Sequence, residues 1–161
     1  MRVAPSRRVL AGYVVYEEDE PIVSHPRDPF HRVDILSSTR HVRIELEDEL
    51  LPESSRTYMV FETGLPVRFY IPPEDVRVEL RPNDKRTYCA YKGEASYNSL
   101  DVAGSERDDL VWGYVQPLRQ AAELAGRVAF FDEKVDVILD GRRRENPRTA
   151  LSASIVEEAD L

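Results

Sequence analysis

The sequence has little of several features that would define a class of protein. Its 161 residues include one cysteine, and no apolar run approaches the roughly 18 residues needed to cross a bilayer. One cysteine cannot form an internal disulfide, which agrees with a reducing compartment. The short apolar stretch near the N-terminus ends at Glu17, Glu18 and Asp19 with no small-residue cleavage site after it, so we expect no signal peptide. We therefore predict a cytoplasmic protein without a membrane partner.

Positive charge is also scarce. The chain has 22 Lys and Arg residues against 30 Asp and Glu residues, which gives a net charge of −8. A polyanion such as nucleic acid would be repelled by this balance. The one basic cluster, Arg142 to Arg144, is followed directly by Glu145. We therefore expect no nucleic-acid partner.

Sequence motifs for metal and phosphate chemistry are missing too. His25, His31 and His41 are six and ten residues apart, a spacing that matches no known ligand pattern. There is no glycine-rich phosphate loop and no nucleophile-elbow motif. We expect no metal site, and the sequence does not define a cofactor.

What the sequence does contain is a series of short segments typical of strands. The segment 41–48 alternates cleanly, with Val42, Ile44 and Leu46 on one face and charged residues on the other. Further strands are expected over 10–18, 57–63, 67–71, 86–91, 94–102, 109–115, 127–131 and 135–140. Because strands recur at short intervals, we predict a mainly β, compact antiparallel single domain resembling a barrel or sandwich.

Prolines and glycines mark where these segments end. A short helix is expected over about 117–125, since proline opens it and Gly126 follows it. The segment PPEDV suits one helical turn, and the last two strands are expected to pair as a hairpin over 132–134. We predict a loop over 24–33. Periodicity is lost after Gly141, so we predict a β domain over 1–141 and a mobile tail over 142–161.

The segment TYCAYKGEASY, residues 87–97, is the most informative for function. Lys92-Gly93 suits a two-residue hairpin turn, because glycine adopts a positive φ without steric cost. This turn would place Cys89 opposite Ser96. Lys92 is also one of three lysines among nineteen arginines. A GC-rich genome that encodes most cations as arginine explains this scarcity, and Lys92 can then be a plain turn cation. The alternative is a role that guanidinium does not fill, such as a compact charge or an amine that loses its proton.

Five motifs in order carry a family resemblance. They are Tyr70-Ile71-Pro72, Cys89-Ala90-Tyr91-Lys92-Gly93, Trp112-Gly113-Tyr114, Gly126-Arg127-Val128-Ala129-Phe130-Phe131 and Val135-Asp136-Val137. On these motifs the chain, over about residues 10–142, resembles the bacterial family called domain of unknown function 427, which also carries a nucleotidyltransferase label. The resemblance implies a small, mainly β fold. Ala90 and Phe131 depart from the proline and tyrosine usual in the family.

The nucleotidyltransferase label is not supported by these residues. Such enzymes show a Gly-Ser turn followed by acidic residues at alternate strand positions, which hold Mg²⁺ against the triphosphate. Here Gly104-Ser105 is followed by adjacent acids at 108 and 109, and Asp136 and Asp140 are four residues apart.

Three functions are open from the sequence. The first is a small-molecule pocket beside the Cys89–Gly93 hairpin, in which Lys92 faces an anionic ligand. The walls of that pocket would be Tyr70, Tyr91, Trp112 and Tyr114. The second is an enzyme in which Lys92 or Cys89 reacts covalently while an acid (Glu62, Asp75 or Asp136) moves protons. The third is a domain that binds a protein partner through exposed strands and its acidic tail.

Each candidate residue also has a purely structural interpretation. Cys89 can be a small buried hydrophobe, and the aromatic residues can be core. Glu62 can face water from an edge strand, although burial would raise its pKa. The sequence leaves open the oligomeric state and whether any reaction occurs.

Overall fold

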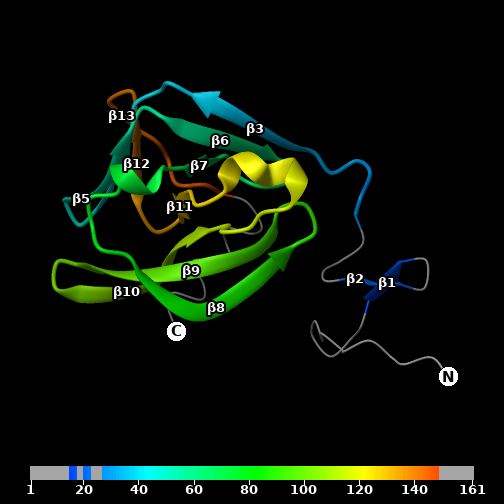
Figure 1. The fold of residues 1–161 in the computed structure, drawn as a ribbon. Coiled ribbons are helices and arrows are strands. Elements are labelled where there is room, and N and C mark those ends of the chain that lie inside the picture. The colour runs from blue at the N-terminus through cyan, green and yellow to red at the C-terminus, as the bar shows by residue number, and fades with distance from the viewer. Residues whose placement is uncertain (1–14, 18–19, 23–26, 149–161) are drawn as a thin grey trace.

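The computed structural model describes residues 15–17, 20–22 and 27–148, and antiparallel strands make up more than half of these residues (Figure 1). The strands are β1 (Val15–Glu17), β2 (Glu20–Ile22), β3 (Val33–Ser38), β4 (Val42–Leu46), β5 (Glu49–Ser54), β6 (Thr57–Glu62), β7 (Arg68–Tyr70), β8 (Arg81–Cys89), β9 (Gly93–Val102), β10 (Ser105–Gly113), β11 (Val128–Phe130), β12 (Asp136–Leu139) and β13 (Arg142–Arg143). Two 3₁₀ elements accompany them, η1 (Pro73–Asp75) and η2 (Arg119–Leu124). The mainly β prediction is confirmed.

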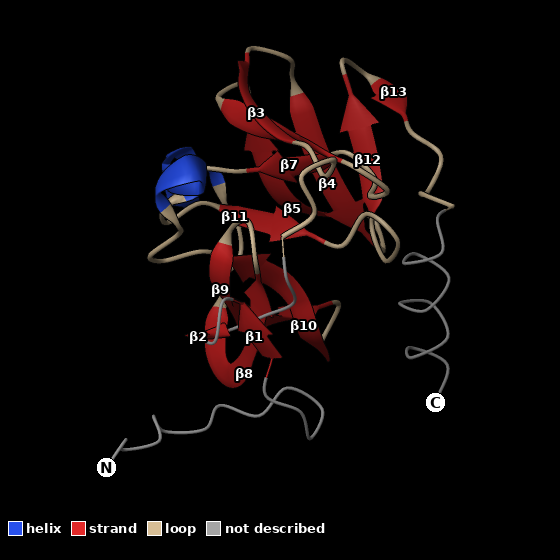
Figure 2. Ribbon diagram, turned by 90° about the vertical axis from the view of Figure 1, so that its right-hand side faces the viewer, coloured by secondary structure: helices blue, strands red, loops and turns tan. Residues whose placement is uncertain are grey.

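Three sheets build the domain. Their strand orders are β11-β10-β9-β8, β13-β12-β4-β5 and β3-β6-β7, while β1 pairs with β2 alone. Every strand pair is antiparallel. Figures 1 and 2 show the three sheets around a common interior without closing into a barrel.

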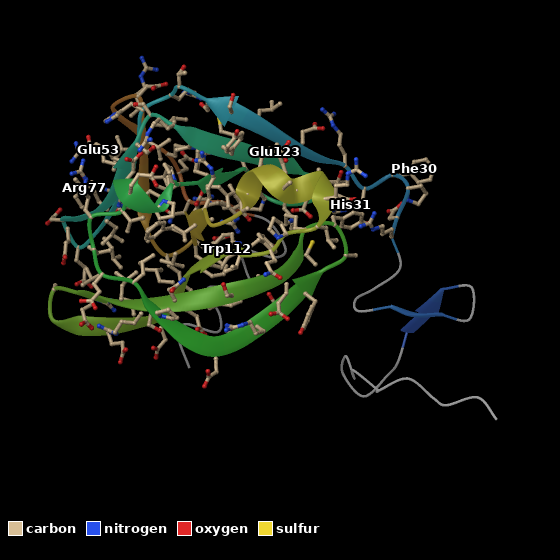
Figure 3. The ribbon with its side chains drawn as sticks, in the orientation of Figure 1. Phe30, His31, Glu53, Arg77, Trp112 and Glu123 are labelled. Carbon is tan, nitrogen blue, oxygen red and sulfur yellow. The ribbon has the colours of Figure 1, made fainter. Side chains whose placement is uncertain are left out.

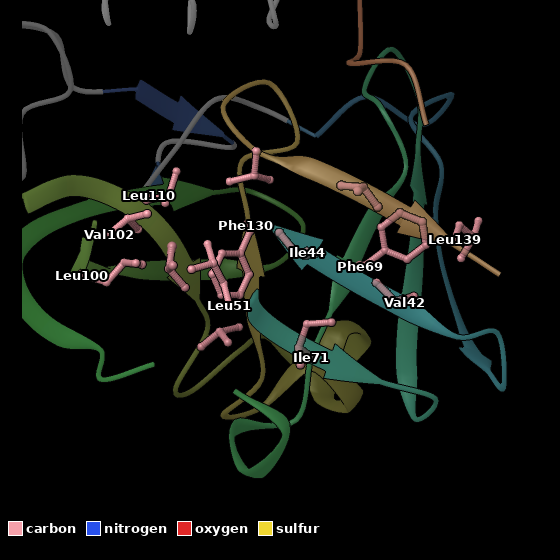
Figure 4. Close-up of a cluster of buried hydrophobic side chains, with 14 residues drawn as sticks. Val42, Ile44, Leu51, Phe69, Ile71, Leu100, Val102, Leu110, Phe130 and Leu139 are labelled. Atoms are coloured by element: carbon pink, nitrogen blue, oxygen red, sulfur yellow. The ribbon is translucent and has the colours of Figure 1, made fainter. Parts of the chain in front are cut away.

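The larger core cluster is aliphatic and draws on all three sheets (Figure 4). Its fully buried members include Val42 and Leu51 on β4–β5, Phe69 on β7, and Leu100 on β9. Burying each such side chain contributes about 1.5–3 kcal/mol. This cluster therefore holds the sheets together.

A second core cluster lies on the other side of the sheet β3-β6-β7 and is aromatic. It contains Tyr70, Tyr97, Tyr114 and Trp112, the only tryptophan of the chain. Along β7, Phe69 packs in the first cluster and Tyr70 in the second, because successive strand residues point to opposite faces. The sheet β3-β6-β7 thus separates an aliphatic interior from an aromatic one.

The predicted hairpin between 127–131 and 135–140 is wrong. β11 pairs with β10, and β12 pairs with β4, so the two strands belong to different sheets. The connecting residues cross from one sheet to the other, and Asp132 and Glu133 within them are buried beside Arg68. The contact of these two acids with Arg68 on β7 therefore holds the segment between β11 and β12 in place.

Among the described residues, helical structure is limited to the two short 3₁₀ elements. The helix expected over 117–125 is present as η2, and its non-helical Ala121 (φ −122°, ψ 22°) interrupts it. The turn expected in PPEDV is η1. Within the described ranges, no helix is both long and apolar enough to cross a bilayer.

The edges of the domain differ from expectation in several places. β3 and β5 were not expected from the sequence, and the strand predicted over 10–18 is described only at 15–17, as β1. Residues 27–32 form a loop, as predicted. β13 pairs with β12, so the first residues of the predicted tail join a sheet. Residues 149–161 lie outside the described residues, and for them the tail stays a prediction.

Gly113 allows β10 and β11 to pair closely. A Cβ atom at this position would lie 2.4 Å from the carbonyl oxygen of Arg127, a distance that real contacts do not reach. We expect Gly113→Ala to lower the free energy of unfolding by about 3 kcal/mol, the upper end for overpacking. Gly64→Ala serves as a control, since that position has a positive φ but open space around it, and its cost is about 1–2 kcal/mol. Urea unfolding of both variants checks this, and an equal loss in the two would contradict the steric account.

Candidate functional site

A cavity of about 410 Å³ lies within the aromatic cluster. Its lining residues are Val60, Glu62, Leu65, Pro66, Arg68, Tyr70, Lys85, Thr87, Lys92, Ala95, Tyr97, Trp112, Tyr114 and Phe131. Most of them follow one rule: β6, β7, β8 and β9 each contribute two residues that are two positions apart, and Trp112 and Tyr114 do the same at the end of β10. Side chains two apart share a face of a strand, so the cavity is where these inward faces meet. Figure 3 shows Trp112 in this interior, between β9 and the sheet β3-β6-β7.

Lys92 and Glu62 form an ion pair at the cavity wall. Each side chain is 7% exposed, and Lys92 Nζ donates to Glu62 Oε2. The second carboxylate oxygen, Oε1, lies 2.9 Å from Nε2 of His31. Glu62 therefore joins a residue of the cavity to a histidine at the edge of the domain.

The segment 27–32, called the strap below, passes over the turn that carries Lys92. Arg27 Nε donates to the carbonyl oxygen of Ala90 at 2.9 Å, and the backbone N–H of Asp28 donates to the Tyr91 hydroxyl at 2.7 Å. The His31 ring stacks on the Tyr91 ring, with centroids 4.1 Å apart and planes 16° apart. The strap is thus attached to the hairpin and, through His31, to Glu62.

The turn between β8 and β9 differs from the predicted two-residue turn. Cys89 pairs with Gly93, so residues 90–92 form a three-residue connection, and Ser96 faces Arg86 instead of Cys89. The Leu118 N–H donates to the Lys92 carbonyl at 2.9 Å, and Gly93 has φ +104°. A glycine that ends a three-residue loop is a common hairpin solution. The three-residue turn carries Lys92, whose side chain lies at the cavity wall.

The aromatic wall is desolvated. Burial raises the pKa of the Tyr70 and Tyr114 phenols well above the usual range, and the nearby Glu62 charge acts in the same direction on both. Trp112 Nε1 donates to the Tyr70 hydroxyl at 3.2 Å. Both phenols are therefore neutral and can donate or accept hydrogen bonds.

Arg68 is the second cation of the lining, and acids outside the lining hold its guanidinium in position. Its guanidinium binds Glu133 through two hydrogen bonds of 2.8 and 2.7 Å, and it lies over the Trp112 and Phe131 rings. Asp132 is 3.8 Å from this guanidinium. Two-point binding of this kind fixes the orientation of an arginine.

Lys85 is the third cation of the lining. Its Nζ donates to Asp109 at 2.9 Å and lies 4.8 Å from the centre of the Tyr97 ring. This side chain is 44% exposed, so it marks an open side of the cavity.

The structure brings five of the candidate residues to the cavity: Glu62, Tyr70, Lys92, Trp112 and Tyr114. Tyr91 is buried under the strap and does not line the cavity. Cys89 is partly buried and likewise outside the lining.

The other acids and histidines lie elsewhere. Asp75 binds Arg56 and Ser54, and Asp136 binds Arg143, all away from the lining. His41 pairs with Glu53, and His25 lies outside the described residues. In the part of the chain that the structure describes, no three His, Cys, Asp or Glu side chains are arranged to hold a metal ion.

Sequence reasoning missed Arg68, Lys85, Tyr97 and Phe131 as lining residues, and it considered His31 only as a metal ligand. A sequence signal existed for Arg68, which stands two positions from Tyr70, a predicted wall residue on the same strand. The neighbours of Lys85 and Tyr97 two positions away, Thr87 and Ala95, were not predicted to line the cavity, so these two residues had no such signal. Phe131 follows β11 and had no such signal.

The comparison with known families agrees with the fold. The family model described as domain of unknown function (DUF427) matches residues 34–141. The chain belongs to this family. No similar protein was found among curated proteins. The match includes Glu62 and Lys92 but begins after the strap, so His31 reaches the site from outside the matched range.

The buried ion pair between Lys92 and Glu62 predicts that single variants lose more stability than the double variant. Removing one partner leaves an uncompensated buried charge, so Glu62→Leu or Lys92→Met alone should lower the free energy of unfolding by about 3–5 kcal/mol. The double variant removes both charges and should recover most of that loss. Urea unfolding of the three variants checks this. A double variant that loses as much as the sum of the singles would show no coupling between the two charges and would contradict this account.

Asp132 predicts a pH dependence. Burial raises the pKa of its carboxyl to about 7, while Arg68 and Arg144 act in the opposite direction. The native state then holds a proton that the unfolded chain has lost, so this group's contribution to stability falls as pH rises from about 4 to about 7. Asp132→Asn keeps the shape without the titration. Its stability relative to wild type should therefore rise between about pH 5 and pH 8. Thermal unfolding across this range checks it, and a constant difference would contradict the assignment.

Proposed function

We propose that this protein binds a small organic molecule with an anionic group in the cavity, with Lys92 facing that group. One observation carries the proposal. In a chain of net charge −8, the cavity lining contains three cations, Arg68, Lys85 and Lys92, and one acid, Glu62. Two of the three lysines in the whole sequence are in this one place.

The positions of the partner acids support the same proposal. Glu133 and Asp109 neutralise Arg68 and Lys85 from positions that do not line the cavity. An anion inside would therefore meet the cations directly. Low-dielectric walls strengthen such attraction, because field lines are not screened by water.

Size and wall chemistry agree with a small-molecule site. Ligand cavities typically measure about 300–1,000 Å³ and combine apolar or aromatic walls with a few polar groups. This cavity has aromatic side chains from β7, β9 and the end of β10, with polar groups from β6 and the 90–92 turn.

The covalent alternatives have less support. Cys89 does not line the cavity, and the Lys92 amine is already engaged in an ion pair with Glu62. The docking alternative has less support within the described residues, because their two most exposed large apolar side chains, Phe30 and Val115, lie on separate loops.

A thermal-shift screen of small carboxylates, phosphate esters and neutral analogues tests the proposal. Ligand at about one hundred times its Kd adds about 2.7 kcal/mol of stability, which raises the Tm by several degrees. The shift should be smaller in Lys85→Gln and in Lys92→Met than in wild type. Because the Lys85 side chain is partly exposed, its substitution is not expected to disturb folding. Arg143→Gln is the matched control, because it removes one exposed cation on a different sheet. Ligand shifts that survive both cavity substitutions, or a screen in which no compound stabilises wild type, would contradict the proposal.

A further inference from the structure

Hydrogen-bond donors without acceptors gather in the cavity. A lysine ammonium carries three N–H groups. Among the residues that the structure describes, Glu62 is the one acceptor for Lys92 Nζ, although this side chain is 93% buried. Two N–H groups of Lys92 therefore remain for an acceptor in the cavity.

Two phenols add to this set. The Tyr114 hydroxyl has no hydrogen-bond partner within the described chain, although only 5% of the residue is exposed. The Tyr70 hydroxyl accepts from Trp112, so its own O–H remains free to donate. The two rings are stacked with centroids 6.3 Å apart, and both residues line the cavity together with Lys92 and Glu62. They belong to the same region of the cavity as Lys92.

This inventory restricts the group that binds there. Four donors remain, two on Lys92 and one on each phenol, and a matching partner is a group that only accepts. A carboxylate has two oxygens with about four acceptor positions and no donor. An amide would bring its own donors against these donors. The donor set therefore favours a carboxylate.

The rest of the wall restricts the body of the ligand. Tyr97, Trp112 and Phe131 line the cavity, and the Trp112 and Phe131 rings are 4.4 Å apart with planes tilted by 38°. A flat ring gains attraction from such neighbours beyond the area that it buries. The Arg68 guanidinium over both rings adds positive charge at the same wall.

We propose that the ligand class is an aromatic carboxylate, whose carboxylate accepts from Lys92, Tyr70 and Tyr114 while its ring packs against Trp112 and Phe131. This inference rests on the proposed function and narrows it. It assigns Tyr114 as a specificity residue, since its hydroxyl has no structural partner in the described fold.

A matched set of probes tests the ligand class. Phenylacetate carries both features, phenylacetamide lacks the charge, cyclohexylacetate lacks the flat ring, and phenylphosphonate replaces the carboxylate. Titration calorimetry gives each Kd. Emission of Trp112 reports the location, because it is the only tryptophan in the chain. We expect phenylacetate to bind and change the emission, phenylacetamide to bind at least about tenfold more weakly, and cyclohexylacetate about threefold to tenfold more weakly.

A pair of conservative variants tests the role of Tyr114. Tyr114→Phe removes a hydroxyl that the fold does not use, so its Tm should equal or exceed that of wild type. It should weaken phenylacetate about threefold to tenfold and reduce the preference over phenylacetamide. Tyr58→Phe is the control, since Tyr58 on β6 does not line the cavity, and it should bind as wild type does.

The outcomes separate this inference from the function on which it rests. Equal Kd values for phenylacetate and phenylacetamide, or for phenylacetate and cyclohexylacetate, would overturn the aromatic carboxylate while leaving small-molecule binding intact. Tighter binding of phenylphosphonate would overturn the choice of carboxylate. No binding of phenylacetate at millimolar concentration would overturn the inference as well. If the thermal-shift screen also finds no ligand, both proposals fail.

Discussion

The contact between Lys92 and Glu62 connects parts of the molecule that the chain keeps far apart. Lys92 belongs to the turn between β8 and β9, and Glu62 ends β6 in a different sheet. Two buried charges lose their hydration, which only close pairing and further hydrogen bonds offset. The turn, the end of β6 and His31 of the strap must therefore keep their relative positions for the pair to be tolerated.

The positions of the charged side chains make the cavity lining more positive than the protein as a whole. The chain is acidic overall, yet the acids that pair with Arg68 and Lys85 lie outside the lining. A lining that holds positive charge in a protein of opposite net charge needs such supports, because unpaired buried cations are costly. Under the proposed function, the same supports would orient the cations before a ligand binds, which would reduce the entropy lost on binding.

Much of the fold could be predicted from local pattern. Alternation indicated β4, and glycine and proline marked the turns that delimit β6 and β7, because these signals come from residues adjacent in sequence. The separation of β11 from β12 could not be predicted, since it depends on Arg68 meeting Glu133 65 positions away. The three-residue turn before Gly93 depends on another distant contact, the hydrogen bond from Leu118.

The candidate site was predictable in part for the same reason. Scarcity and motif drew attention to Lys92, and an acid in an apolar strand drew attention to Glu62. Arg68 lacks both marks, because arginine is common in this chain. Lys85 is one of the three lysines but lies outside the five motifs and just before the strand predicted over 86–91. Only the meeting of several inward strand faces shows that they share one cavity.

The strap has a consequence for how this domain is delimited. The family match starts at residue 34, two residues after the strap ends, so a domain cut at that boundary would keep all three sheets and lose His31. Glu62 would then hold one partner instead of two, and the Tyr91 ring would lose its stacked neighbour and meet water. The range that the family model matches is therefore shorter than the unit that contains these contacts, which includes the strap.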